Sequence, residues 1–206
     1  RRLVPLRKPI LGVNFGKLGF MAEFDMPALV RGASEIFGET ALHVHESPLL
    51  RVRVFGPDGR KGFESIAAND CVLTAGPPYR MIRMALSIDG NVGPTVSGDG
   101  LIVSTSTGST AYNLSAGGPI VSPELDALAI TPIAAHSLSF RPIVVPLSSR
   151  VQIGVTRVNA DGGHGTTLVV DGQVLTKIGE DDGIEITRHD RRAIFVRNPQ
   201  TSYWST

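Results

Sequence analysis

The sequence contains one cysteine, Cys71, and no apolar run long enough to cross a membrane. A single cysteine excludes an intrachain disulfide framework and is typical of the reducing cytosol, so we expect a cytoplasmic protein. The formal net charge is only +1 over 206 residues. Charge therefore gives no reason to expect nucleic acid or a membrane surface as a partner. The hydrophobic fraction of 42% is that of a globular protein with a substantial core.

Several motifs that carry chemistry are absent. Nothing matches the P-loop, the glycine fingerprint of dinucleotide-binding folds, or the G-x-S-x-G turn of serine hydrolases. His43 and His45 stand two residues apart, a spacing compatible with metal ligation from a strand, but no third ligand is evident in the sequence. We therefore predict no metal site formed by these histidines.

From Leu42 onward the chain consists mainly of short β-branched runs bounded by Gly, Pro, Asp or Asn. Leu50–Val54 alternates apolar and charged residues, turns at Gly56–Gly59 and resumes, which predicts a β-hairpin. A second alternating run ends at Asp89-Gly90. Many short strands at this spacing predict a mostly antiparallel β-sandwich or barrel, interrupted by a helical turn within residues 111–128.

The first 40 residues have a different pattern. Ile10–Val13 is predicted to be a short buried strand, and a helix is predicted to begin at an Asp25 N-cap, with Pro27 in its first turn, and to end near Gly38. This strand-loop-helix order is typical of the end of an α/β unit. We place a domain boundary near residue 40 and expect the earlier strands of the unit to precede Arg1.

The segment Asp99–Val121, DGLIVSTSTGSTAYNLSAGGPIV, has no charged side chain after Asp99. Clusters of Ser, Thr and Gly are usually turns, because their hydroxyls bond nearby backbone. This cluster is unusually long and follows a fully apolar strand. Hydroxyls, backbone amides and the flat face of Tyr112 suit a neutral planar ligand such as an adenine ring better than a bare phosphate.

The same segment closely resembles the signature of the NAD kinases, which phosphorylate the adenosine ribose 2′-hydroxyl of NAD. ILGVNFGKLGF, AANDCVLTAG, ITPIAAHSLSFRPIVVP and LVVDGQ resemble further segments of that family in the same order, so the resemblance covers residues from about 9 to about 174. It implies a mostly β fold: a C-terminal antiparallel β-sandwich of the NAD kinase type (residues 41–206) preceded by the end of an α/β domain (residues 1–40). We expect that the C-terminal tail can fold back onto the N-terminal domain.

The resemblance also implies a set of NAD-binding residues. Thr107, Thr110, Ala111, Tyr112 and Ser115 would line the adenine pocket, and Asn69 and Asp70 would contact the ribose region. Asp99 would bond a ligand amide or amine, and Asp171 would approach from a neighbouring subunit of a homodimer or homotetramer. ATP or polyphosphate would be the phosphoryl donor, with Mg²⁺ or another divalent cation as cofactor.

Three departures from the family pattern stand out. Ser106 replaces a common proline, Asp70 replaces the commoner glutamate, and the Gly-Gly-Asp-Gly catalytic loop is absent. Ser97–Gly100 resembles that loop, but a single glycine precedes Asp99. We expect the catalytic aspartate to lie upstream of Arg1, and the 206-residue chain alone to be inactive. The alternative is a non-catalytic nucleotide-binding module.

Overall fold

The structure is a computed structural model that describes residues 7–15, 22–39, 41–136, 140–161 and 164–201. These residues form two compact units. The larger unit is Pro48–Asp190, and the smaller one combines the described parts of Arg2–Ser47 and Arg191–Thr206. None of the helices among the described residues has the length and apolar character of a membrane span.

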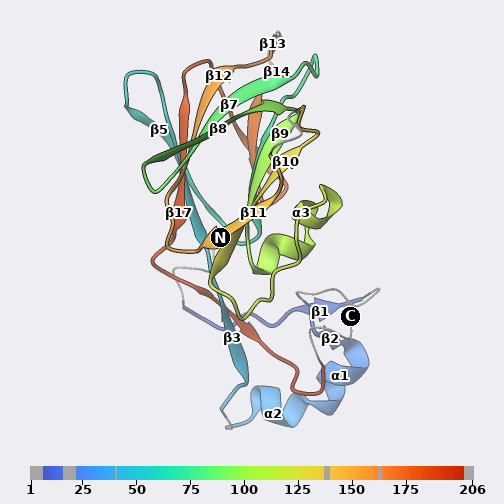
Figure 1. Ribbon diagram of the computed structural model, residues 1–206. Helices are drawn as coiled ribbons and strands as arrows, with labels where there is room; N and C mark the ends of the chain where they lie inside the picture. The colour runs from blue at the N-terminus through green and yellow to red at the C-terminus, as the bar shows by residue number, and fades with distance from the viewer. Residues whose placement is uncertain (1–6, 16–21, 40, 137–139, 162–163, 202–206) are drawn as a thin grey trace. The chain divides into compact units, whose positions relative to one another are not determined.

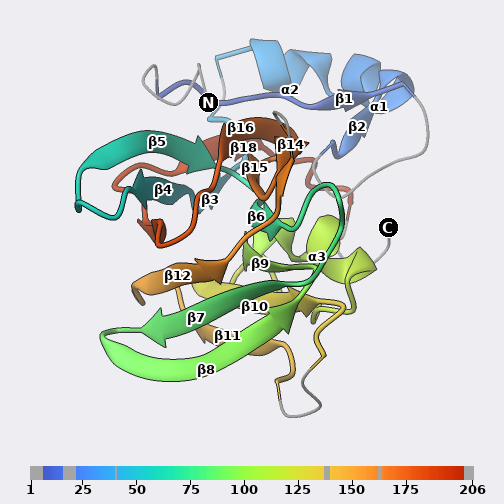
Figure 2. The same ribbon diagram turned by 90° about the horizontal axis from the view of Figure 1, so that it is seen from above.

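The larger unit is a sandwich of two six-stranded sheets, in which every neighbouring pair of strands is antiparallel (Figures 1 and 2). The first sheet has the order β11 (Ile143–Pro146), β10 (Ala127–Ile133), β9 (Gly100–Thr105), β6 (Asp70–Thr74), β15 (Thr167–Val170), β16 (Gln173–Lys177). The second has the order β5 (Lys61–Ala67), β4 (Leu50–Phe55), β17 (Gly183–Arg188), β12 (Val151–Arg157), β7 (Ile82–Ile88), β8 (Asn91–Gly98). A short pair, β13 (Ala160–Asp161) and β14 (His164–Gly165), completes the unit.

The core lies between the two sheets and follows from the period-two pattern of the strands. Leu50, Val52 and Val54 of β4 are buried in one large apolar cluster, whereas the alternate residues Arg51 and Arg53 are only half-buried. Successive side chains of a strand point to opposite faces, so this alternation directs the apolar face of β4 inward.

β9 is the exception, because all six of its residues are buried. Leu101 and Val103 belong to the main core, while Ser104, on the opposite side of the strand, is also fully covered. The 3-10 helix η2 (Thr107–Thr110) and the helix α3 (Tyr112–Ser115) follow β9 directly and pack against it (Figure 1). The part of the uncharged segment that follows β9 is thus a cover over part of the outer face of the first sheet.

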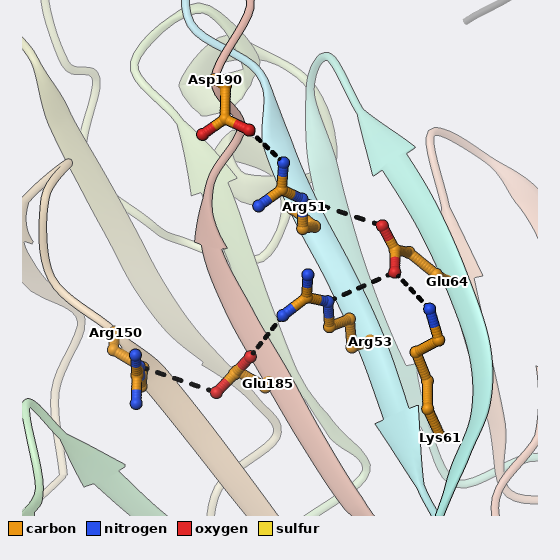
Figure 3. Close-up of polar contacts among 7 residues, drawn as sticks. All are labelled: Arg51, Arg53, Lys61, Glu64, Arg150, Glu185 and Asp190. Atoms are coloured by element: carbon orange, nitrogen blue, oxygen red, sulfur yellow. Dashed lines mark hydrogen bonds and ion pairs between the residues drawn. The ribbon is translucent and has the colours of Figure 1, made fainter.

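The outer face of the second sheet carries a connected set of ion pairs (Figure 3). Arg53 of β4 lies directly opposite Glu64 of β5 on one side and Glu185 of β17 on the other. Its guanidinium reaches the two carboxylates at 3.3 and 3.5 Å. Lys61 adds a 2.9 Å contact to Glu64, and Arg150 a 3.6 Å contact to Glu185. Within this set, each glutamate contacts at least one cation from a neighbouring strand.

The smaller unit contains a parallel pair, β1 (Val13–Asn14) with β2 (Phe24–Asp25), the helices α1 (Met26–Arg31) and α2 (Ala33–Phe37), and an antiparallel pair, β3 (Val44–Ser47) with β18 (Ala193–Val196). Ile10 bridges to Phe195 in parallel, so the C-terminal segment lies beside the N-terminal one within this unit. Arg197 Nε donates to the Glu23 carboxylate at 3.0 Å, which further joins the two segments.

The structure confirms the antiparallel β-sandwich and the Asp25 N-cap, whose Oδ1 accepts a 2.7 Å bond from the Ala28 N–H. It corrects two details. The first strand is Val13–Asn14 and half-buried, later than the predicted buried strand at Ile10–Val13. The predicted single helix is broken at Gly32, the C-cap of α1. The described units divide at Ser47–Pro48; a boundary near residue 40 with a larger α/β domain preceding it stays a prediction.

Candidate functional site

An open pocket of about 540 Å³ lies on the outer face of the first sheet. Its floor comes from β6 and β15, and its rim comes from the turn before β6, the turn after β15 and the start of α3. The lining residues are Asn69, Asp70, Val72, Thr74, Ala111, Tyr112, Val169, Asp171 and Gly172. Five of the nine residues predicted to bind the ligand meet here: Asn69, Asp70, Ala111, Tyr112 and Asp171.

Asp70 is the most deeply placed carboxylate of the pocket. It begins β6, lies directly opposite Ser104 of β9 and is only 4% exposed. Burial, and then the nearby charge of Asp171, raise the pKa of Asp70 to about 6, while the Tyr112 backbone amide acts in the opposite direction. The cause is that a poorly solvated carboxylate near a like charge favours its neutral form. At neutral pH the group is still mostly ionised and can accept hydrogen bonds from a ligand.

Asp171 lies beside Asn69 and Asp70 of its own chain. Its carboxylate accepts hydrogen bonds from the backbone N–H groups of both residues, at 2.8 Å from Asn69 and 3.2 Å from Asp70. The resemblance had suggested that Asp171 would arrive from a neighbouring subunit. In this structure a single chain brings it to the pocket, because β15 pairs with β6 and ends next to the start of β6. Sharing of sites between subunits stays a prediction.

The uncharged segment is held against Asn69 by close backbone contacts. The Thr105 N–H donates to the Asn69 carbonyl at 2.9 Å, and the Gly108 N–H donates to Thr105 Oγ1 at 2.9 Å. A Cβ atom at Gly108 would collide with the Asn69 backbone. Glycine is therefore required at this position for the 3-10 turn to approach so closely, and the approach sets Ala111 and Tyr112 at the rim.

Several buried polar atoms around the pocket have no hydrogen-bond partner within the described part of the chain. They are Asn69 Oδ1, Ser104 Oγ, Ser106 Oγ and Thr107 Oγ1. Most buried polar groups in native proteins are hydrogen-bonded. Asn69 is the one of these four residues that lines the pocket, and the other three lie on β9 and in the turn that follows it.

The other predicted ligand residues are not among those that line the pocket. Thr107 and Thr110 lie in η2 and are half-buried, and Ser115 is exposed at the end of α3. Asp99 is exposed in the turn before β9, whereas the 3-10 turn follows the far end of that strand. Contacts of these four residues with a ligand stay predictions.

The sequence analysis missed the apolar floor of the pocket. Val72 and Thr74 of β6 and Val169 of β15 point outward, while their neighbours Cys71, Leu73, Leu168 and Val170 point into the core. Period-two alternation marks two faces, but β6 is nearly continuous in apolar residues, so the pattern did not reveal that one face lines a pocket. Such a floor suits the planar, weakly polar parts of a ligand.

Metal ligands do not gather anywhere in the part of the chain that the structure describes: no group of three or more His, Cys, Asp or Glu side chains could hold an ion. His43 and His45 lie in the smaller unit, and among the described residues neither belongs to such a group.

Comparisons with known proteins agree with the motifs. The profile of the ATP-NAD kinase C-terminal domain matches residues 68–198. The NAD kinase of Moorella thermoacetica is 38% identical over 205 residues, a match that covers 100% of this chain and 64% of that protein. The chain therefore spans a little under two thirds of that relative's length.

Two solved structures share the fold. The crystal structure of yeast NADH kinase complexed with NADH superposes with a TM-score of 0.85 at 28% identity, covering 96% of this chain and 57% of that one. The NAD kinase from Archaeoglobus fulgidus in complex with ATP gives a TM-score of 0.72 at 29% identity, covering 93% and 70%. With the sandwich, the pocket and these matches together, the chain belongs to the NAD kinase family.

Proposed function

We propose that the protein containing this chain phosphorylates the adenosine ribose 2′-hydroxyl of NAD to give NADP, with ATP or polyphosphate as donor. The observation that carries this proposal is the pocket of Asn69, Asp70, Tyr112 and Asp171 in a chain whose relatives are named NAD kinases. A carboxylate can accept hydrogen bonds from a ribose diol, and an amide and a flat apolar face suit an adenine ring; this pocket offers all three groups.

In this proposal Asp70 accepts hydrogen bonds from ribose hydroxyls, and the amide of Asn69 bonds a second polar edge of the ligand. Tyr112, which is 49% exposed beside the pocket, packs its ring against the adenine, and Val72 and Val169 exclude water beneath it. Ordered contacts on both sides of the ribose would hold the 2′-hydroxyl in one orientation. Positioning of this kind contributes much of the rate in phosphoryl transfer.

In the transfer itself, the 2′-oxygen forms a bond to the terminal phosphorus while the bond from that phosphorus to the donor's bridging oxygen breaks. We expect the residue that takes the hydroxyl proton to belong to the Gly-Gly-Asp-Gly loop upstream of Arg1. We propose that Mg²⁺ would be held largely by the donor's phosphates, as is common for this ion, and would neutralise charge on them during transfer. We also propose a cytoplasmic homodimer or homotetramer.

The direct test is to incubate the full-length protein with NAD, ATP and Mg²⁺ and to measure NADP. Absence of NADP with either ATP or polyphosphate would refute the proposal. The 206-residue chain assayed in parallel is expected to bind NAD without phosphorylating it. Full-length protein that binds NAD but makes no NADP with any donor would favour the non-catalytic module instead.

A further inference from the structure

The hairpin turn between β15 and β16 is a tight turn of two residues. Val170 pairs with Gln173, so the loop contains only Asp171 and Gly172. Both have positive φ, 48° and 73°, as the two central residues of a type I′ turn require. The turn is attached to β6, because the Asp171 N–H donates to the Asp70 carbonyl at 3.0 Å.

The Asp171 carboxylate accepts hydrogen bonds from three consecutive backbone N–H groups. Oδ1 accepts from Asn69 at 2.8 Å, from Ala68 at 3.1 Å and from Asp70 at 3.2 Å, and Oδ2 accepts from Ala68 at 2.9 Å. Convergent amides of this kind form an anion-binding concavity, and here the chain's own carboxylate fills it. Three of these contacts are to Oδ1, which leaves that oxygen little capacity for a ligand, whereas Oδ2 accepts only the N–H of Ala68, which it shares with Oδ1.

The same segment is held from its other side by Thr105. Its hydroxyl donates to the Ala68 carbonyl at 2.8 Å, and its N–H donates to the Asn69 carbonyl at 2.9 Å. The N–H groups of Ala68 and Asn69 therefore point at Asp171 and their carbonyls at Thr105. The side chains of Asn69 and Asp70, which carry no such restraint from these contacts, line the pocket.

We propose that Asp171 is a positioning residue: it fixes the backbone of residues 68–70, and through that backbone presents Asn69 and Asp70 to the nucleotide. This inference rests on the proposed function for the identity of the nucleotide, and it assigns Asp171 a role other than direct ligand contact. Asp171 fixes the backbone of residues 68–70 whether or not a ligand is bound, so this part of the inference can be tested on the ligand-free protein.

The chain contains a matched control. Asp89-Gly90 forms the two-residue turn between β7 and β8, with φ of 53° and 79°. Asp89 Oδ1 likewise accepts a backbone N–H, that of Arg150, at 2.7 Å, but it lies in the second sheet and does not line the pocket. Asp171→Asn and Asp89→Asn make the same change at the same turn position, and asparagine tolerates positive φ.

The first measurement is amide hydrogen exchange of ligand-free full-length protein. We expect Asp171→Asn to speed exchange at Ala68, Asn69 and Asp70 by about ten-fold or more, because a charge-assisted acceptor is lost. Asp89→Asn should leave these three amides unchanged. Thr105→Val, which loosens the same segment without touching the turn, should also speed their exchange and serves if Asp171→Asn folds poorly.

The second measurement is NAD affinity by calorimetric titration. We expect the dissociation constant to rise about ten-fold for Asp171→Asn and less than about two-fold for Asp89→Asn. Reduced affinity with unchanged exchange at residues 68–70 would make Asp171 a direct ligand and overturn the inference, as would faster exchange with unchanged affinity. If wild-type protein does not bind NAD, the proposed function fails, and the exchange data still decide whether Asp171 fixes the segment.

Discussion

The Thr131 hydroxyl on β10 donates a 2.7 Å hydrogen bond to Asn113 Oδ1 on α3, and both side chains are completely buried. The Asn113 Nδ2 group donates to the carbonyls of Ser109 and Pro119, each at 2.9 Å. One asparagine therefore holds the uncharged cover to the sheet beneath it. The rim residues of the pocket are carried by this cover, so its attachment bears on both stability and binding.

Replacing Asn113 with Ala is expected to lower the free energy of unfolding by at least about 2 kcal/mol, because two carbonyls and one hydroxyl lose their buried partner. Denaturant unfolding measures the loss. Leu114→Ala, in the same helix but 41% exposed, is the control and should cost much less. Equal losses for the two variants would contradict the central role of Asn113.

Asp70→Ala is expected to raise the dissociation constant for NAD about ten- to a hundred-fold in the full-length protein, because charge-assisted bonds to ribose hydroxyls contribute about 1.5–3 kcal/mol. Calorimetric titration measures the affinity, and melting curves report the fraction folded. Normal affinity with a lowered melting temperature would reduce Asp70 to a structural residue that closes the turn before β6.

The stability of the folded protein should depend on the ionisation of Asp70 in a defined pH range. Its pKa rises from an ordinary 3.8 to about 6 on folding, so the native state holds a proton that the unfolded chain releases. The stabilisation from this proton is present below about pH 4 and lost as pH rises through about 6, on the order of 2–3 kcal/mol. Unfolding curves of wild type and Asp70→Asn should converge at low pH and diverge above pH 6; parallel curves would contradict the shift.

Ser106→Pro is expected to stabilise the protein by about 0.4–1 kcal/mol, chiefly by restricting the unfolded chain. Ser106 has φ of −55°, which proline adopts readily, and the preceding Thr105 is in an extended strand, as proline requires. The change also removes a buried hydroxyl without a partner among the described residues. Thermal unfolding would detect the gain, and a lower melting temperature would show that the Ser106 N–H is needed.

Glu64→Gln is expected to cost less than about 1 kcal/mol, even though Glu64 contacts Arg51, Arg53 and Lys61. Its side chain is 36% exposed, and ion pairs open to water are weak and screened by salt. The cost should vanish in about 1 M NaCl, where the Debye length is about 3 Å. A large cost that persists in high salt would show that the set in Figure 3 acts as a cooperative network.

Local patterns were sufficient to predict most strands of the sandwich, because alternation in runs such as Leu50–Val54 directly reflects two-faced burial. They failed where the surroundings decided the conformation. β8 contains Pro94 and two glycines, Gly93 and Gly98, and as an edge strand it tolerates residues that would disrupt a central one. β10 begins within residues 111–128, where the sequence analysis predicted only a helical turn.

For the candidate site, too, some residues could be predicted from the sequence and others could not. Asn69, Asp70 and Tyr112 could be predicted from motifs in the sequence, and the pairing of β6 with β15 explains why Asp171 joins them. That pairing links residues about a hundred positions apart, and no local pattern specifies which strands become neighbours. The three amides on Asp171 and the outward valines of the floor follow from this pairing, so they could be found only in the structure.

Because Cys71 is buried, the reactivity of its thiol reports how often the native structure opens. The thiol lies on β6, next to Asp70, within the core between the two sheets, and burial raises its pKa, so the reactive thiolate is scarce in the native state. With no other cysteine in the sequence, alkylation can proceed only as fast as the sandwich separates. The labelling rate of the untouched protein therefore measures how often the floor beneath the pocket comes apart, with no probe introduced.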